Sequence, residues 1–153
     1  MTVRVSTGFR DLILGTNAFR DIFERGVIFI YTGSQPATAD AAVSGTKLGQ
    51  VTESAGSFNF GSPDNGLLFA APDNGSIAKD GGQLWQFTGL ANGTAGWGRL
   101  MGNALDNEGQ SDSLPRVDFS IGRSGADLIL SNTSIVTGAT HTVDQFTYRI
   151  RAQ

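Results

Sequence analysis

Apolar residues in the first part of the chain recur at the spacing of a helix. Phe19 and Phe23 fall on one face, the polar residues before them can cap a first turn, and Gly26 follows as a left-handed stop. This pattern predicts a helix over residues 17–25. The preceding residues predict one or two further helical turns over 8–14, which end at a glycine.

From residue 27 onward the apolar pattern changes to that of short strands. The run 27–32 is β-branched and aromatic, and apolar and polar residues alternate in 116–121 and again in 142–151. Two Pro-Asp-Asn-Gly turns, at 63–66 and 72–75, interrupt the chain, and such sequences favour reversals of direction. The remaining strand candidates are 48–52, 57–60, 67–70, 83–88, 96–101, 127–130 and 134–136.

Short strands about 8–12 residues apart, without helices between them, are typical of sandwiches and small barrels. We therefore predict a mainly β chain. Its expected architecture is an antiparallel β-sandwich, with a jelly roll as one form of it, and one or two short N-terminal helices. Residues 1–26 are expected to form an N-terminal helical arm and residues 27–153 the β-sandwich domain, together one compact domain. The 21 glycines suit a chain with many tight turns.

Charge and cysteine content exclude several classes of protein. The net charge is −3, the pI is about 4.9 and the eleven Lys and Arg residues are scattered, so no nucleic-acid partner is expected. The absence of cysteine excludes disulfides, thiolate zinc sites and a cysteine nucleophile. The longest apolar run, 27–31, is too short to span a membrane, and no signal peptide is visible. We expect a protein that is made in the cytoplasm and has no membrane partner.

No arrangement of catalytic residues stands out in the sequence. A Ser-His-Asp triad would have to use His141, the only histidine, and Asp144 lies three residues further along the same predicted strand. Residues three apart in a strand face opposite sides, so Asp144 is badly placed to orient His141. We predict a non-enzymatic protein without a cofactor, in which His141 is a turn residue that opens the last strand.

The loop 106–112 is the best candidate for an ion site. Asp106, Glu108 and Asp112 supply three carboxylates, which a hard cation such as calcium accepts, but their spacing is not that of an EF-hand. A solvated acidic loop is the preferred interpretation, so no metal is predicted and calcium remains the weaker alternative.

The N-terminal segment carries a large number of apolar residues for a peripheral helical region. Part of this face should cover one end of the β core, and part is predicted to meet a neighbouring protein, since exposed apolar patches mark interaction sites. Packing of the whole face on the chain's own sheet is an equal alternative. The contact residues predicted on this basis are Phe9, Leu12, Phe19 and Phe23, together with the loop from Gln35 to Asp40.

Three stretches of the chain resemble small structural proteins of tailed bacteriophages. They are IFIYTGSQPATADAA at 28–42, continuing to GTKL at 45–48, GLANGTAGW at 89–97 and IGRSGADLILSNT at 121–133. The resemblance spans roughly residues 20–150 and implies a virion component made in the host bacterium. Its implied partners are the phage major capsid protein or tail proteins, and a homo-oligomer is expected.

Two destinations in the virion fit this resemblance. A capsid decoration, or cement, protein needs no active site and must match several copies of a shell protein, and such proteins gather around symmetry axes. A tail or neck subunit fits the same description, and we prefer decoration. A second alternative is a carbohydrate-binding β-sandwich module that stacks sugars on Trp85 and Trp97, although large aromatic residues in half-buried strands more often belong to the core.

Overall fold

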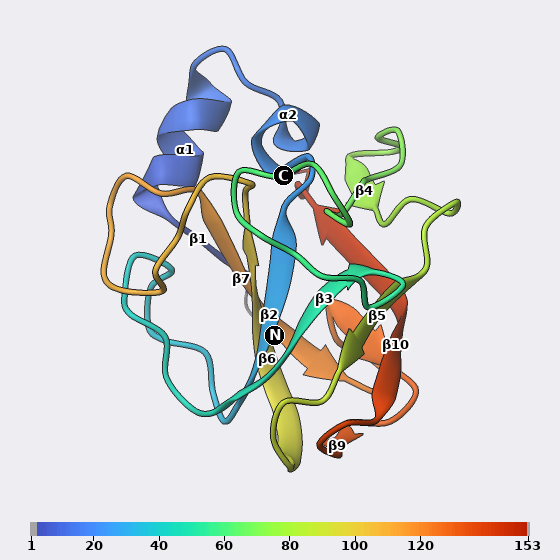
Figure 1. Ribbon diagram of the computed structural model, residues 1–153. Helices are drawn as coiled ribbons and strands as arrows, with labels where there is room; N and C mark the ends of the chain where they lie inside the picture. The colour runs from blue at the N-terminus through green and yellow to red at the C-terminus, as the bar shows by residue number, and fades with distance from the viewer. Residues whose placement is uncertain (1–2, 153) are drawn as a thin grey trace.

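The computed structural model describes residues 3–152 as a mainly β chain with two short helices (Figure 1). Helix α1 is Thr7–Leu14 and helix α2 is Phe19–Phe23. The strands are β1 Arg4–Val5, β2 Val27–Thr32, β3 Lys47–Glu53, β4 Ser76–Ala78, β5 Trp85–Thr88, β6 Gly93–Met101, β7 Arg116–Gly122, β8 Leu128–Leu130, β9 Ser134–Ile135 and β10 Thr140–Arg149. The predicted β-rich fold with short N-terminal helices is confirmed.

The strands form a mixed barrel and not a clear antiparallel sandwich. Seven of them close a ring in the order β7, β8, β10, β5, β3, β2 and β6, because β6 pairs with β2 on one side and with β7 on the other. The pair β7–β8 is parallel, with Ile121 opposite Leu128. Alternation along a strand shows which face is buried but does not identify its neighbours, so the sequence pattern could not distinguish the barrel from a sandwich.

Three of the predicted elements differ from the structure. Helix α2 is shorter than the predicted 17–25, and the left-handed residue after it is Arg25, with a φ of 60°. Gly26 is required for another reason: a Cβ there would lie 2.1 Å from the carbonyl oxygen of Met101. Residues 57–60 are not a strand, and 67–70 make only isolated bridges.

Strand β2 is buried on both faces, which explains its continuous apolar sequence. Ile28 and Ile30 belong to the large core inside the barrel. Val27, Phe29 and Tyr31 belong to a second, smaller core on the outer face of β2, where Trp97 and Met101 of β6 join them. Partly buried residues of the surrounding loops pack over this outer core: Val43, Phe58 and Phe60.

The two N-terminal helices close one end of the barrel (Figure 1). Phe9, Phe19 and Phe23 all belong to the large core, and the Phe9 and Phe23 rings stack with their centroids 5.5 Å apart. Buried Ser6 ties the start of α1 to the barrel, because its hydroxyl accepts from the Phe9 N–H and donates to the Leu114 carbonyl. Residues 3–26 therefore share their core with the rest of the chain.

Candidate interaction surfaces

Two long irregular segments, 33–46 and 102–115, lie together on one side of the barrel (Figure 1). We call this pair of segments the loop lobe. Backbone hydrogen bonds join them: the Val43 N–H donates to the Glu108 carbonyl at 3.1 Å, and the Ser111 N–H donates to the Asp40 carbonyl at 2.8 Å. The two segments therefore behave as one surface.

A buried arginine of β7 organises the second segment of the lobe. The Arg116 guanidinium binds both oxygens of Asp106, with Nε and Nη2 each 2.7 Å from one of them. Nη2 also donates to the Gly109 carbonyl at 2.7 Å. The Arg116 side chain is fully buried and that of Asp106 almost so. This two-point pairing fixes the path of residues 106–109, because the guanidinium is planar and rigid.

A second buried arginine, on the neighbouring strand β6, holds the first segment. Arg99 donates from Nε and Nη2 to the two oxygens of Asp118, at 2.7 and 2.8 Å. Its remaining nitrogen Nη1 donates to the Ala41 carbonyl at 3.0 Å. Burial raises the pKa of Asp118, against the opposing effect of the hydrogen bonds and charge of Arg99. The buried pair thus connects the barrel wall directly to the lobe backbone.

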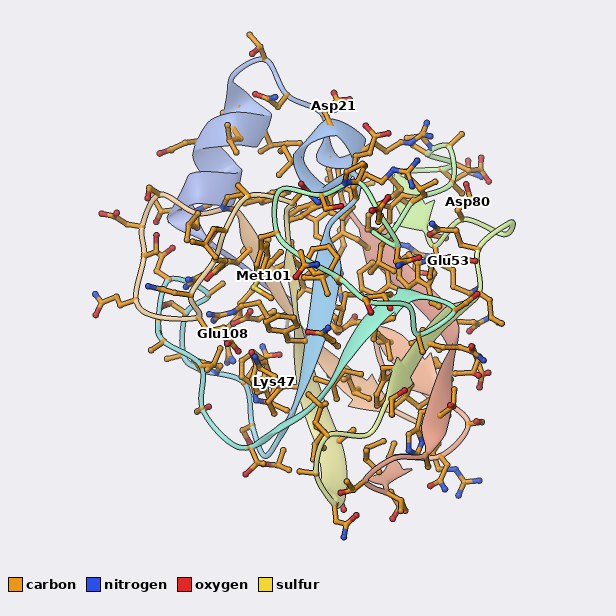
Figure 2. All side chains as sticks on the ribbon, in the orientation of Figure 1. Asp21, Lys47, Glu53, Asp80, Met101 and Glu108 are labelled. Atoms are coloured by element: carbon orange, nitrogen blue, oxygen red, sulfur yellow. The ribbon has the colours of Figure 1, made fainter. Side chains whose placement is uncertain are left out.

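A polar cluster lies at the edge of the lobe, beside the outer core (Figure 2 labels Glu108 and Lys47). Glu108 accepts a hydrogen bond from the Tyr31 hydroxyl and pairs with the Lys47 ammonium at 2.7 Å. The Tyr31 ring stacks on Trp97 with a centroid distance of 4.6 Å. Burial, followed by the hydrogen bond to Glu108, raises the pKa of Tyr31 strongly.

The structure places the two parts of the predicted contact surface next to each other. Asp40 accepts from both the N–H and the hydroxyl of Thr7, each at 2.8 Å, so the lobe is tied to the start of α1. Gln35 is half-buried in the same segment. Leu12 is half-buried as well, whereas Phe9, Phe19 and Phe23 are buried in the chain's own core.

Several large apolar side chains remain exposed, and one of them belongs to the loop lobe. Leu105 is 73% exposed within the second segment of the lobe. Leu14, at the end of α1, is 84% exposed. The other exposed large apolar residues among those described are Leu84, Leu90, Val136 and Ile150. The apolar surface that the isolated chain offers near the lobe is therefore Leu105 and not the predicted phenylalanines.

The three carboxylates of the predicted ion loop do not converge. Asp106 is occupied by Arg116 and Glu108 by Tyr31 and Lys47, while Asp112 is exposed to solvent. Within residues 3–152 no group of three or more His, Cys, Asp or Glu side chains is arranged to hold a metal ion. Two of the three carboxylates, Asp106 and Glu108, are thus used for pairing within the chain, which the spacing in the sequence does not reveal.

Of the remaining candidate residues, His141, Trp85 and Trp97 pack against other parts of the chain and Asp144 does not. His141 lies in β10, where its ring stacks on Phe87 and its Nε2 accepts from the Val136 N–H at 3.4 Å. Asp144 is exposed. Trp85 and Trp97 are 0% and 1% exposed, so neither ring offers a platform on which a sugar can stack.

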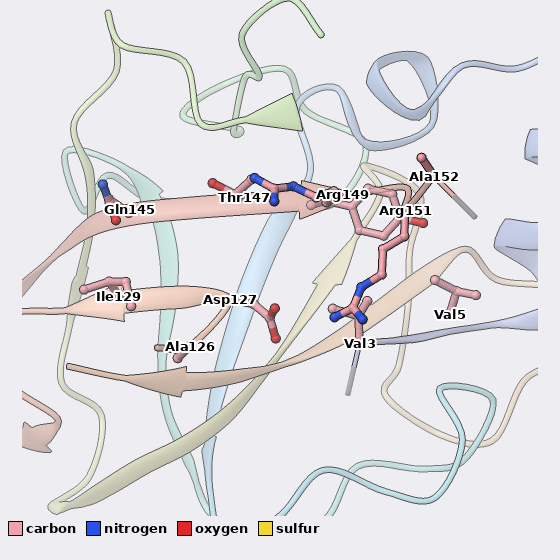
Figure 3. A pocket seen from close by; sticks show the side chains of 11 residues that line it. Val3, Val5, Ala126, Asp127, Ile129, Gln145, Thr147, Arg149, Arg151 and Ala152 are labelled. Carbon is pink, nitrogen blue, oxygen red and sulfur yellow. The ribbon is translucent and has the colours of Figure 1, made fainter. Parts of the chain in front are cut away.

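A groove of about 910 Å³ lies on another side of the barrel, between β1 and the C-terminal end of β10 (Figure 3). Val3 and Val5 form one wall, and Arg149, Arg151 and Tyr148 belong to the other. Its remaining lining residues are Ala126, Asp127, Ile129, Gln145, Thr147 and Ala152. The groove could not be predicted from the sequence pattern, because it arises from the way the strands pair.

Comparison with protein families, with curated proteins and with solved structures finds no match to this chain. In residues 3–152 no helix is long and apolar enough to cross a membrane. The functional interpretation therefore depends on the geometry of the lobe and the groove. Arg99 and Arg116 were missed by the sequence analysis. Arg99 is a charge among the apolar residues of its strand, and that anomaly is a signal that could have identified it. Arg116 falls on the polar side of the alternation over 116–121 and carries no such signal.

Proposed function

We propose that this chain is a non-enzymatic structural protein of a tailed-phage virion, which decorates the capsid by binding between shell subunits. The observation that carries the proposal is the loop lobe, a solvent-facing surface of irregular backbone that two buried arginines hold in place. The resemblance of residues 28–48, 89–97 and 121–133 to phage structural proteins supports the virion assignment.

Fixing the lobe before binding favours a tight complex. Flexible loops lose conformational freedom when a partner orders them, and this loss weakens binding. Here the backbone at Ala41 and Gly109 is already held by buried guanidinium groups. Rigid scaffolds that present fixed loops are a common way to build a protein-binding surface. The exposed Leu105 supplies an apolar contact on that surface.

The same surface serves a tail or neck subunit equally well, and this is the alternative within the proposal. Both destinations place the chain in the virion, with the major capsid protein or tail proteins as partners. Both also fit a homo-oligomer assembled in the cytoplasm of the host. The two destinations are distinguished by the part of the particle, head or tail, that retains the protein.

The test uses particles of the phage that encodes this chain, assembled without it, and purified protein of known mass in solution. We expect a fixed stoichiometry on heads, and Leu105→Asp should weaken binding by about tenfold, equivalent to about 1.4 kcal/mol. Leu84→Asp is the matched control, because Leu84 is also exposed but lies outside the lobe. Co-sedimentation of particles with labelled protein measures the stoichiometry and the affinity of each variant.

Retention on isolated tails alone would move the assignment to the tail or neck. Equal binding of Leu105→Asp and the unchanged protein would reject the lobe as the contact surface. Absence of binding to every particle fraction would reject a virion role.

A further inference from the structure

The barrel wall is incomplete between β1 and the C-terminal end of β10. One side of β7 pairs with β1 at Val117 and Asp118 and then with β8 at Ile121 and Gly122. Strand β8 continues the wall to β10 as far as Phe146, and one further backbone bond joins the Thr147 N–H to the Asp127 carbonyl at 3.2 Å. Beyond this point β1 and β10 face each other with no described strand between them, and the groove lies there.

The backbone on both sides of this gap has the geometry of a free sheet edge. The Ser6 N–H donates to the Arg116 carbonyl at 3.0 Å, so Ser6 faces β7 and Val5, one residue earlier, faces the gap. On β10 the Ile150 N–H donates to the Gly75 carbonyl at 2.9 Å, so Arg149 faces the gap. In residues 3–152 the backbone groups of Val5 and Arg149 on these edges have no partner strand.

Side chains around the gap are sorted by polarity. Val3, Val5 and Tyr148 pack against the core inside the barrel, and the Tyr148 ring stacks on Phe19 at 4.9 Å. Arg149 and Arg151 are exposed, and Figure 3 shows Arg151 reaching from the end of β10 toward Val3. The gap is therefore apolar toward the interior and positively charged at its rim.

Asp127, which directly precedes β8, brings one negative charge into the lining of the groove. Its carboxylate accepts from the Ser120 hydroxyl at 2.9 Å and from the Ser120 N–H at 3.2 Å. These hydrogen bonds orient the carboxylate but do not neutralise it, so the charged lining residues Arg149, Arg151 and Asp127 together leave a net charge of +1 for an incoming chain to meet.

We propose that this groove binds an extended acidic segment of another protein, which enters as the missing strand. Its backbone would bond to the edges at Val5 and Arg149, as in other cases of strand addition. Alternate side chains would be apolar, facing Tyr148, and acidic, facing Arg149 and Arg151. The inference stands on the sheet topology and does not depend on the virion role proposed above.

The test uses a blocked seven-residue peptide, acetyl-Thr-Val-Glu-Val-Glu-Val-Thr-amide, and the same peptide with lysine in place of glutamate. Titration into the full ¹⁵N-labelled chain should shift the amide signals of Val5 and Arg149 with the glutamate peptide. The lysine peptide should bind at least about tenfold more weakly. No shift with the glutamate peptide at millimolar concentration would overturn the proposal.

Two variants separate backbone pairing from charge. Val5→Pro removes the N–H that faces the gap, and Val5→Ala shortens the same side chain but keeps that N–H. Binding should fall by about tenfold more in the proline variant than in the alanine variant. Arg151→Glu should reverse the preference between the two peptides, whereas Arg123→Glu, an exposed control outside the groove, should leave it unchanged.

The charge variant keeps the test decisive if Val5→Pro does not fold. Equal preference of Arg151→Glu and the unchanged protein for the glutamate peptide would contradict the charge assignment. Light scattering of the protein alone completes the experiment. If the protein forms a concentration-dependent dimer and Arg151→Glu abolishes it, the occupant of the groove is a second copy of this chain and not a segment of another protein.

Discussion

The lobe side of the barrel and the groove side satisfy their polar groups in opposite ways. On the lobe side, β6 is paired along both edges, and the buried arginines of β6 and β7 are each paired with a carboxylate. On the groove side, β1 and the end of β10 keep backbone edges with no described strand beside them. A wall whose strands are paired and whose buried charges are neutralised presents a fixed surface. A wall with unpaired strand edges can accept new backbone hydrogen bonds.

The sharpest way to test this contrast is to break one buried pair on the lobe side. Asp118→Ala leaves the Arg99 guanidinium buried without its carboxylate, and we expect a loss of about 3–5 kcal/mol in the free energy of unfolding. Urea denaturation measures this loss. The double variant Arg99→Met/Asp118→Leu is the control, because replacing both charges by apolar groups should be far less harmful. A loss below about 1 kcal/mol in Asp118→Ala would show that the pair does not fix the wall.

Alkaline pH should weaken the lobe side through Tyr31. A free tyrosine loses its proton near pH 10.0, but burial and Glu108 raise the pKa of Tyr31 above this value. Above pH 10 the unfolded chain therefore binds fewer protons than the folded chain, and the free energy of unfolding falls as pH rises. The expected slope is about 1.4 kcal/mol per pH unit for this group.

Stability curves from pH 9 to 11 measure the slope, and Tyr31→Phe should reduce it. A slope remains in that variant, because burial also raises the pKa of Tyr148. Identical slopes for the variant and the unchanged protein would show that Tyr31 ionises as freely in the folded chain as in the unfolded one.

The smallest effect is expected on the open edge. Val5→Pro removes an N–H that bonds to no described strand, so its cost relative to Val5→Ala should stay within about 1 kcal/mol. Leu100→Pro in β6, which is paired on both sides, should by contrast unfold the chain. Thermal unfolding of the three variants gives the comparison. A Val5→Pro loss as large as that of Leu100→Pro would show that the edge is not open.

Local sequence patterns predicted the elements better than their arrangement. Helix α1 and most strands fall where periodicity placed them, because alternation reports directly on burial. The short strand β4 was missed, since three residues are too few to show a period. The closure of the barrel depends on pairings such as Leu100 with both Ile28 and Val117, which no local pattern contains.

The candidate sites were predicted less completely, for the same physical reason. Gln35 and Asp40 were expected at a contact surface; both lie in the lobe, Gln35 beside Arg4 of β1 and Asp40 beside the start of α1. The ion pair between Asp106 and Arg116 could not be predicted from their spacing in the sequence, because the two side chains meet only once the lobe folds back on β7. The groove depends on where two strands stop pairing, which is a property of the whole sheet.

The central position of β10 also determines when this chain can fold. Strand β10 pairs with β8, β5 and β4, so the ring stays open until the residues around 140–149 are available. A growing chain on the ribosome would therefore carry nearly all the residues of the large core before the barrel could enclose them. Contacts between residues so far apart in sequence form slowly. During synthesis the chain should thus depend on chaperones until its last strand emerges, and premature termination before β10 should yield aggregates.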